Sequence, residues 1–352
     1  MNNYKFKQTG IISYGAYIPK YRITINEIAT NWHKDPTVIM KGLGIIEKAV
    51  PATTDDTISL AVNASKIAIS KLAEKPLIGA VYTGSESHPY AVKSTSAIVG
   101  EALGIGNNFT AADLEFACKA GTAGMQIVAG MVESGMIDNG LAIGADTAQS
   151  KPGDALEYSA SAASAAYLMG SNKTEMIAEL ILTVSFTSDT PDFWRRENQK
   201  YPSHAGRFTG EPSYFKHIIS AAKEIMSRAA MNITDFSHVI LHMPNAKFPQ
   251  IVAQQLKISE KQLEAGFIVP YLGNSYSACS MVGLSGALDV AKPGEYILLC
   301  SYGSGSGSDA FIFKVTDNIN QLKILQPLSE QIKHKQYLTY SQYLFNLNQL
   351  FK

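Results

Sequence analysis

The feature that most constrains this 352-residue chain is an order of segments that occurs twice. A helical run of small residues begins at Cys118 and is followed by the apolar run LAIGADT, a Gly/Ser-rich link and the run AAYLMG. A second such run begins at Asn274 and is followed by YILLCSYG, the link SGSGSD and AFIFKV. A period this long in an α/β chain predicts a duplicated fold with a pseudo-two-fold axis, near which the two helix starts face each other. The alternative is that the similarity has no significance, because any α/β protein repeats helices and strands in a similar order.

Short apolar runs alternate with helical patterns along the whole chain. The expected strands cover residues 11–13, 79–83, 141–145, 165–169, 178–186, 239–242, 296–301 and 311–315. The expected helices cover residues 58–72, 122–134, 213–231, 248–256 and 281–289. Several of the strands are apolar with little alternation, which is typical of strands covered on both faces. The pattern predicts an α/β fold with layered, mostly parallel sheets.

The repeat divides the chain into an N-terminal half, residues 1–172, which carries Cys118, and a C-terminal half, residues 173–352, which carries His242. Residues 189–212 form the longest stretch that reads as a loop. Because long ordered loops in compact domains are usually functional, we expect this stretch to cover a substrate. The segment from Pro327 onward is expected to form surface helices.

The composition and net charge of the chain exclude several classes of protein. The chain has 30 basic and 30 acidic residues, so nothing predicts a nucleic-acid or membrane-surface partner. The first ten residues lack the apolar core of a secretory signal, and charges interrupt every apolar stretch before 18 residues. Three cysteines without paired spacing form neither a disulfide framework nor a metal motif. We therefore expect a globular cytoplasmic protein whose cysteines are buried residues or nucleophiles.

Cys118 is the strongest candidate for a nucleophile. It lies in DLEFACKAGTAG, where a β-like run ends and a helix of small residues begins. A helix N-terminus favours the thiolate, and small neighbours allow an acyl group to approach closely. A buried inert thiol is the other interpretation. Cys279 and Cys300 lie within apolar runs and are expected in the core.

Glu86 and His242 follow strands at positions suited to acid–base chemistry. Glu86 lies in YTGSESHPY, where partial burial would raise the pKa of its carboxyl toward neutrality. His242 ends the run VILH and would point into the crevice where open α/β sheets bind ligands. A solvated loop acid and a structural histidine are the respective alternatives. Histidines 33, 204, 217, 238 and 334 are expected at surface or loop positions.

The tract GSGSGSD, residues 303–309, leaves a strand. Glycines there permit close approach to a ligand, and backbone N–H groups at such a turn can hold an oxyanion. No GK[ST] follows, so the tract is not a nucleotide P-loop. A flexible linker is the other interpretation. Lys247, Arg195, Arg196 and Arg207 lie near these turns and could hold the phosphates of a nucleotide-like handle, or be ordinary surface charges.

Taken together, these segments resemble the 3-hydroxy-3-methylglutaryl-CoA synthases, the short archaeal type in particular. The resemblance runs from about residue 10 to 345 and is carried by SYGAYIPKYRI, GSESHPYAVK, DLEFACKAGT, AIGADTAQSKPGDALEYSA, TPDFWRRENQKYPSHAGRFTGEPSYF, HMPNAKFP, GNSYSA and SYGSGSGSDAF. Each motif alone is weak, but the combination is specific. The resemblance implies a duplicated thiolase-like fold, a layered α-β-α-β-α sandwich with two pseudo-two-fold-related halves, in a protein that works as at least a dimer.

The resemblance also implies the residues' roles. Cys118 matches the acetyl-accepting nucleophile, Glu86 the general acid/base and His242 the histidine that contacts the acetoacetyl carbonyl. The implied binding residues are Ser159, Thr209, Asn274 and Ser304 for the substrate and Lys247 and Arg207 for CoA. The implied reaction is ping-pong, in the mevalonate pathway: acetyl-CoA acylates Cys118, the enolate attacks acetoacetyl-CoA, and water releases HMG-CoA. The backbone N–H groups of Cys118 and Ser304 are the expected donors to the enolate.

No metal or redox cofactor is implied, since both CoA thioesters are substrates. The expected partners are a second copy of the chain, or a dimer of dimers, with an acetoacetyl-CoA thiolase and a small OB-fold scaffold protein.

Two rival functions remain: a ketosynthase III-like or other thiolase-fold acyltransferase, and a scaffold subunit of a multienzyme complex. Glu86 argues against the first, because a decarboxylating enzyme needs no such base, and the presence of Cys118, Glu86 and His242 argues against the second.

Overall fold

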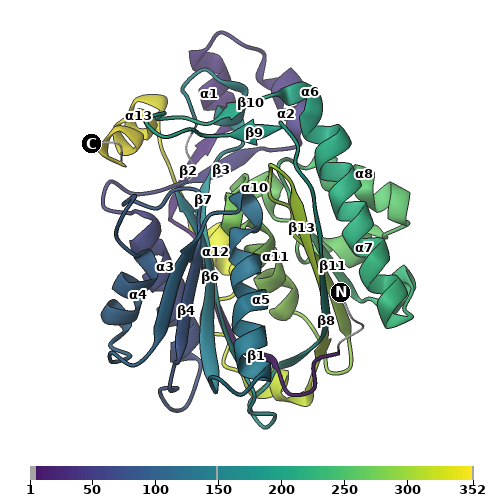
Figure 1. Ribbon diagram of the computed structural model, residues 1–352. Coiled ribbons are helices and arrows are strands. Elements are labelled where there is room, and N and C mark those ends of the chain that lie inside the picture. Colours follow the sequence, from purple (N-terminus) through teal and green to yellow (C-terminus); the bar gives the residue numbers. More distant parts are fainter. Residues whose placement is uncertain (1–4, 148–149, 351–352) are drawn as a thin grey trace.

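A mixed sheet forms the centre of the computed structural model, which describes residues 5–147 and 150–350 (Figure 1). Within that part of the chain the sheet has nine strands in the order β11-β12-β13-β8-β1-β7-β6-β4-β5. These strands are β1 (Gly10–Tyr17), β4 (Ala80–Gly84), β5 (Thr110–Leu114), β6 (Asn139–Thr147), β7 (Ala162–Gly170), β8 (Ala178–Thr187), β11 (His238–Leu241), β12 (Tyr296–Cys300) and β13 (Gly307–Val315). The smaller sheets are made of β2 (Tyr21–Thr24), β3 (Glu47–Val50) and β14 (Gln336–Tyr337), and of β9 (Phe193–Trp194) and β10 (Ser203–His204).

The helices surround and divide this sheet. They are α1 (Ile25–Asn31), α2 (Pro36–Leu43), α3 (Thr57–Ser70), α4 (Thr95–Leu103), α5 (Ala120–Glu133), α6 (Gly206–Phe208), α7 (Phe215–Ala229), α8 (Lys247–Leu256), α9 (Glu260–Glu264), α10 (Val269–Leu272), α11 (Cys279–Leu288), α12 (Leu328–Lys333) and α13 (Tyr340–Leu350). In Figure 1, α3 and α4 cover one side of the molecule, α7 and α8 cover the other, and α5 and α11 lie between the strands of the two halves. The layered α-β-α-β-α arrangement is therefore confirmed.

The two halves repeat one strand order. In the first half β1, β7, β6 and β4 are neighbours, and in the second β8, β13, β12 and β11 are neighbours in the same order. The first two pairings of each set are antiparallel and the third is parallel. The halves join through two residue pairs of β1 and β8, Gly10 with Glu179 and Ile11 with Ala178. This repetition confirms the duplicated fold.

The expectation of mostly parallel sheets is wrong. Only the pairs β4–β5, β4–β6 and β11–β12 are parallel among the described strands of the large sheet. The links from β6 to β7 and from β12 to β13 cross no layer, so β7 and β13 return antiparallel to the strands before them. Apolar runs without alternation show that a strand is covered on both faces, but they do not show its direction.

The central helices are rich in small residues because backbones approach closely there. A Cβ on Gly121 of α5 would lie 2.5 Å from Met281 Sδ and 2.9 Å from the Cα of Gly144 in β6. All ten residues of α11 are buried, which excludes the polar face of a surface helix. Side chains of α5, α11 and the strands on both sides form one continuous apolar core.

The expected elements agree with the structure to within a few residues, except where short strands were not foreseen. All eight expected strands and all five expected helices are present. The strands β2, β3, β5 and β14 and the helices α1, α2, α4, α9 and α10 were not foreseen. The stretch 189–212 contains the hairpin β9–β10 and α6 rather than a loop throughout. The proposed boundary between residues 172 and 173 lies in the link between β7 and β8 and stays a prediction. None of the described helices combines the length and apolar character that a membrane crossing requires.

Candidate active site

A cavity of about 240 Å³ lies where the two halves meet. It is lined by Cys118, Ser159, Thr209, His242, Asn274 and Ser304 among the residues expected from the sequence, and also by Asp192, Phe193, His204, Tyr214, Phe248, Tyr276 and Tyr302. Phe193, His204 and Thr209 come from the segment 189–212, so this segment does form part of the cavity wall.

Cys118 occupies a single 3₁₀ turn, Ala117–Lys119, between β5 and α5. The helix was expected to begin at Cys118, and it begins two residues later, at Ala120. Ala117 has a φ of 46°, which turns the chain sharply after β5. The Cys118 side chain is buried against Ala160 and Tyr276, one from each half of the chain.

Glu86 lies beside this thiol. The Cys118 thiol donates a hydrogen bond to Glu86 Oε1, with the sulfur and oxygen 3.0 Å apart. The loop after β4 is held from both sides, because the Glu86 backbone N–H donates to Asp146 Oδ1 at 2.9 Å and Arg195 Nη2 donates to the Glu86 carbonyl at 3.1 Å. The backbone of Glu86 is thus fixed while its carboxyl faces the thiol.

Burial and neighbouring negative charge raise the pKa values of both groups. Burial, followed by the negative charge of Asp146, raises the pKa of Glu86 to about 8. Burial, followed by Glu86, raises the pKa of Cys118 well above its ordinary value. The helix N-terminus was expected to favour the thiolate of Cys118, whereas burial and Glu86 act in the opposite direction on its pKa. The thiol is a hydrogen-bond donor whose proton has an acceptor in contact.

Asp146, at the end of β6, was missed by the sequence analysis. Its fully buried carboxylate accepts hydrogen bonds from the hydroxyls of Ser85, Ser87 and Ser277 and from the backbone N–H groups of Glu86 and Ser277. Ser277 belongs to the second half, so Asp146 joins the loop of Glu86 to the 3₁₀ turn that precedes α11. Nothing in the sequence GADT distinguishes this aspartate from an ordinary strand-end residue.

His242 follows β11 directly and faces the same cavity. Burial lowers the pKa of its imidazole to about 3, so the ring is neutral at physiological pH. Its Nδ1 is buried and has no hydrogen-bond partner among the described residues. The Tyr214 hydroxyl donates to the His242 carbonyl at 2.5 Å, which fixes the backbone that carries the ring.

Ser159 and Asn274 lie side by side and join the halves. The Asn274 N–H donates to the Ser159 carbonyl at 2.7 Å, and the Ser161 N–H donates to the Asn274 carbonyl at 2.9 Å. Asn274 was expected at a helix start, but α11 begins at Cys279, after the 3₁₀ turn Tyr276–Ala278. The predicted meeting of the two segments is confirmed, because this 3₁₀ turn packs against the turn of Cys118.

Thr209 and Ser304 complete the expected cavity residues. Thr209 follows α6, and Ser304 lies in the turn between β12 and β13. Two lining residues that the sequence analysis did not single out, Tyr302 and Asp192, support this turn. The Tyr302 hydroxyl donates to Asp192 Oδ2 at 2.7 Å, and the Gly305 N–H donates to Asp192 Oδ1 at 2.9 Å.

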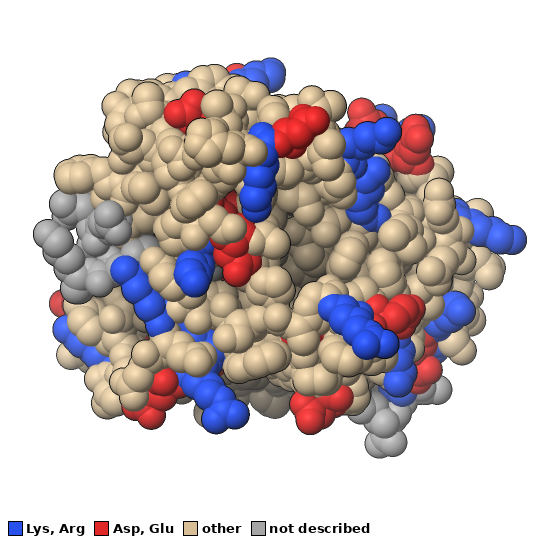
Figure 2. Space-filling view, turned by 90° about the horizontal axis from the view of Figure 1, so that it is seen from above, with Lys and Arg blue, Asp and Glu red and all other residues tan. Residues whose placement is uncertain are grey.

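The two expected CoA-binding residues lie outside the cavity. Lys247 and Arg207 are exposed, each next to a lining residue: Phe248 follows Lys247, and Gly206 precedes Arg207. Figure 2 looks down on the face where α1, α2 and α6 lie in Figure 1 and shows a hollow with Lys and Arg side chains on both sides.

The structure agrees with the expectation for the other two cysteines and differs from it for two of the histidines. Cys279 and Cys300 are free and fully buried, as expected. His217 was expected at the surface but is buried on α7, where its ring lies 2.7 Å from Ser188 Oγ and 2.6 Å from the Ser213 carbonyl. His204 lines the cavity and pairs with Asp154 at 3.1 Å. Within residues 5–147 and 150–350, no cluster of His, Cys, Asp or Glu could hold a metal ion.

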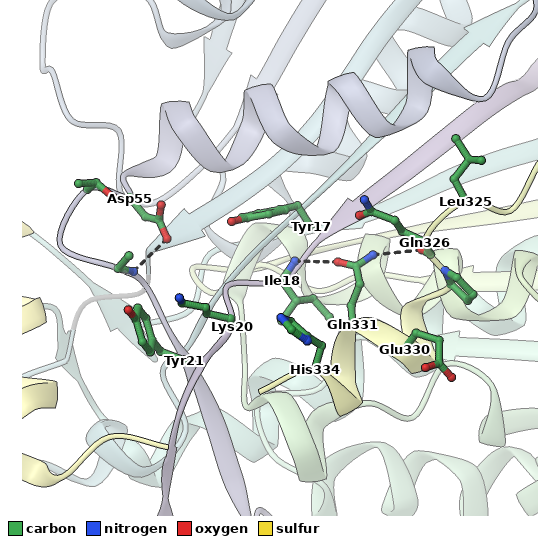
Figure 3. Close-up of a pocket in the computed structure, with 13 residues that line it drawn as sticks. Tyr17, Ile18, Lys20, Tyr21, Asp55, Leu325, Gln326, Glu330, Gln331 and His334 are labelled. Carbon is green, nitrogen blue, oxygen red and sulfur yellow. Dashed lines mark hydrogen bonds between the residues drawn. The ribbon is translucent and has the colours of Figure 1, made fainter. Parts of the chain in front are cut away.

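A second, larger cavity of about 730 Å³ contains none of these residues. It lies between the end of β1 and α12 (Figure 3). Two of its polar groups have protein partners: Gln331 Oε1 accepts from the Ile18 N–H, and Asp55 Oδ2 accepts from the Ala52 N–H. The chemistry of the expected residues therefore belongs to the smaller cavity.

Comparisons with known proteins agree with this geometry. A family model described as 3-oxoacyl-[acyl-carrier-protein (ACP)] synthase III C terminal matches residues 226–315. The solved structure of an HMG-CoA synthase complexed with CoA has a TM-score of 0.86 at 24% identity, covering 96% of this chain and 90% of that one. MvaS in complex with 3-hydroxy-3-methylglutaryl coenzyme A has a TM-score of 0.87 at 20% identity, covering 98% and 92%. These two likenesses show the fold.

The relatives found by sequence are similar enough to show the family as well as the fold. The hydroxymethylglutaryl-CoA synthase of Archaeoglobus fulgidus is 55% identical over 336 residues, covering 95% of this chain and 97% of the relative. The hydroxymethylglutaryl-CoA synthase of Methanocaldococcus jannaschii is 54% identical over the same shares of the two chains. Sharing more than half of its residues with synthases that it matches over nearly their whole length, this chain belongs to the hydroxymethylglutaryl-CoA synthase family.

Proposed function

We propose that this chain condenses acetyl-CoA with acetoacetyl-CoA and water to give HMG-CoA and CoA through an acetyl-S-Cys118 intermediate, in the mevalonate pathway. The observation that carries the proposal is the 3.0 Å contact between Cys118 Sγ and Glu86 Oε1 beside a cavity that His242 also lines. The names of the relatives support the reaction, and the contact supports these residues as its agents.

In the first step Cys118 Sγ attacks the carbonyl carbon of acetyl-CoA. The thiol proton passes to the ionised carboxylate of Glu86, the new C–S bond forms, and the bond to the CoA sulfur breaks. Glu86 returns the proton to the departing CoA sulfur, which leaves Glu86 as a carboxylate again. A buried carboxyl with a pKa of about 8 suits this exchange, because its pKa lies near the operating pH.

In the second step the carboxylate of Glu86 removes a proton from the acetyl methyl group. The backbone N–H groups of Cys118 and Ser304 are the proposed donors to the enolate oxygen. The enolate carbon attacks the C3 ketone of acetoacetyl-CoA, and the new alkoxide takes the proton held by Glu86. His242 is proposed to donate a hydrogen bond to this oxygen as a neutral imidazole, because burial lowers the pKa of its ring to about 3.

In the last step water cleaves the thioester, which restores the Cys118 thiol and gives HMG-CoA its free carboxylate. The hydroxyls of Ser159 and Thr209 and the amide of Asn274 are proposed to bind the acyl groups, since all three line the cavity. The exposed cations of Lys247 and Arg207, next to lining residues, are proposed to hold the phosphates of CoA. The proposed steps use no metal or redox cofactor, because they are proton transfers, an acyl transfer, an addition of a carbanion to a ketone and a hydrolysis, none of which needs an oxidant or a reductant.

The proposed assembly is at least a homodimer. Strand β5 is the edge of the large sheet, and its five residues are only partly buried, so it offers an unpaired strand to a second copy. Association with an acetoacetyl-CoA thiolase and a small OB-fold protein stays a prediction, tested by co-purification. Three free thiols support a reducing, cytoplasmic setting.

Product analysis tests the proposal. The enzyme is incubated with acetyl-CoA and acetoacetyl-CoA, and mass spectrometry is expected to find HMG-CoA only when both are present. Replacing acetyl-CoA by malonyl-CoA separates the rival ketosynthase. A longer 3-oxoacyl thioester and released CO₂ from malonyl-CoA, without HMG-CoA from the first pair, would overturn the proposed reaction.

A further inference from the structure

A buried ion pair lies directly beside the nucleophile. Lys119 follows Cys118 in the chain, and its Nζ is 3.1 Å from Asp309 Oδ2. Their side chains are only 6% and 0% exposed. Removing two charges from water is costly, and a buried pair is weak evidence for stability by itself. Stability alone therefore does not explain why this ion pair lies between the two halves.

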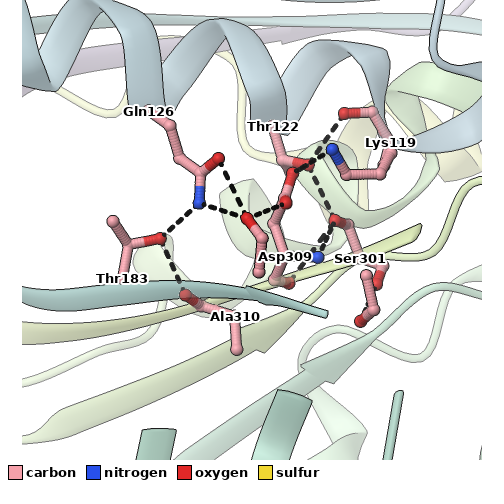
Figure 4. Close-up of polar contacts among 9 residues, drawn as sticks. Lys119, Thr122, Gln126, Thr183, Ser301, Asp309 and Ala310 are labelled. Atoms are coloured by element: carbon pink, nitrogen blue, oxygen red, sulfur yellow. Dashed lines mark hydrogen bonds and ion pairs between the residues drawn. The ribbon is translucent and has the colours of Figure 1, made fainter. Parts of the chain in front are cut away.

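The pair belongs to a polar network that connects α5 to the second half (Figure 4). Asp309 lies on β13, and its Oδ1 accepts from Ser185 Oγ of β8 at 2.7 Å. Thr122 Oγ1 of α5 lies 3.0 Å from Asp309 Oδ2 and 2.7 Å from Ser301 Oγ. The carboxylate therefore receives donors from both halves, next to the turn that carries Cys118.

The aliphatic stem of Lys119 packs against the glycine turn that carries Ser304. A Cβ on Gly303 would lie 2.7 Å from Lys119 Cγ, and a Cβ on Gly307 would lie 2.9 Å from Lys119 Cδ. Gly303 and Gly307 exchange backbone hydrogen bonds of 2.8 Å, so the turn between them is closed. One side chain thus contacts both ends of this turn and holds the charge that Asp309 neutralises.

We propose that Lys119 is a positioning residue: its ion pair with Asp309 and its stem against Gly303 and Gly307 hold the turn of Ser304 at a fixed distance from Cys118. This inference rests on the proposed function, in which both turns contribute donors to the acetyl oxygen. The backbone N–H groups of two separate halves must converge on one atom, and small misplacements of such donors reduce rates strongly.

Single-turnover acetylation tests the proposal. Wild type, K119M, D309N and K119M/D309N are mixed with acetyl-CoA, and intact mass is followed over time. Each single variant leaves one buried charge unpaired and is expected to lower the unfolding midpoint. The double variant removes both charges, keeps the stem's bulk and is expected to recover much of that loss. Its acetylation rate constant is nevertheless expected to stay about 10–100-fold below wild type.

The rate constant separates positioning from folding. Loss of folded enzyme lowers the final amount of acetyl-enzyme, whereas a misplaced turn lowers the rate constant and leaves the final amount unchanged. The matched control is K335M/E47Q, which removes an ion pair of 2.7 Å in the small sheet; its rate constant is expected to equal that of wild type.

A wild-type rate constant in the folded double variant would overturn the inference while leaving the proposed function intact. If the double variant is recovered unfolded, the acetylation rate constant of D309N is compared with that of wild type instead, and a wild-type value would overturn the inference. Absence of any adduct on the wild-type enzyme would overturn the proposed acetylation itself, and this inference with it.

Discussion

The thiol of Cys118 donates to the carboxyl of Glu86 across 3.0 Å, although 32 residues separate them in the chain. The contact exists because β4 and β5 are parallel neighbours, so the loop after one strand meets the turn after the other. The proposed nucleophile and its proposed proton acceptor are thereby brought into contact at the carboxyl ends of two neighbouring strands.

Glu86→Gln is expected to slow catalysis by about 10²–10⁴-fold, because the amide cannot accept the thiol proton or the methyl proton. The measurement is steady-state HMG-CoA formation together with exchange of the acetyl methyl protons in D₂O. Methyl exchange at the wild-type rate in this variant would show that another group is the base.

The same variant is expected to be more stable than wild type at high pH. The pKa of Glu86 is about 8 in the folded chain and ordinary, 4.5, in the unfolded chain. Its contribution to stability is therefore full below the unfolded pKa and is lost progressively as pH rises from there through the folded pKa. Glutamine does not titrate, so the stability of E86Q relative to wild type should rise by about 4 kcal/mol between pH 5 and pH 8.5, at about 1.4 kcal/mol for each pH unit within the window. Thermal unfolding at both pH values measures it. An equal gain at both would contradict the raised pKa.

His242→Ala is expected to separate the two half-reactions. Acetylation of Cys118 should continue, while condensation should fall by about 10²–10³-fold, because the alkoxide loses its hydrogen-bond donor. Intact mass would then show acetyl-enzyme accumulating in the presence of acetoacetyl-CoA. The control is His217→Ala, which removes an equally buried imidazole outside the cavity and should lower stability without this accumulation. Equal accumulation in both would contradict a specific role for His242.

Two glycines of α5 are expected to respond oppositely to alanine. Gly121→Ala should destabilise the fold by about 1–3 kcal/mol, since its Cβ would lie 2.5 Å from Met281 Sδ and 2.9 Å from the Ser277 carbonyl. Gly130→Ala meets no atom within 4 Å and should stabilise by about 0.4–1 kcal/mol. Urea unfolding of both variants provides the comparison, and a stable G121A would show that the central helices pack more loosely than described.

Much of the fold could be predicted because hydrophobic patterns and a repeated segment order are properties of the sequence itself. Strand direction could not, since a strand covered on both faces reads alike in either direction. Strands as short as β2 and β3 carry too few residues for a period to appear.

The site was only partly predictable. Cys118, Glu86 and His242 stand out because each follows a strand in a turn-like context, and the structure places all three together. Asp146 does not stand out, because its role depends on five hydrogen-bond donors that come from distant segments of the chain. The same holds for the buried Asp309, whose ion-pair partner Lys119 is also distant in the sequence. The state of the Cys118 thiol also escaped prediction, since it depends on burial and on Glu86 rather than on the neighbouring helix.

The most direct test is intact mass of the enzyme after incubation with acetyl-CoA alone, followed by addition of acetoacetyl-CoA. An acetyl adduct should form on Cys118, be absent in C118A, and be discharged as HMG-CoA when the second substrate arrives. No adduct on wild type, an adduct on Cys279 or Cys300, or one that acetoacetyl-CoA cannot discharge would contradict covalent catalysis by Cys118.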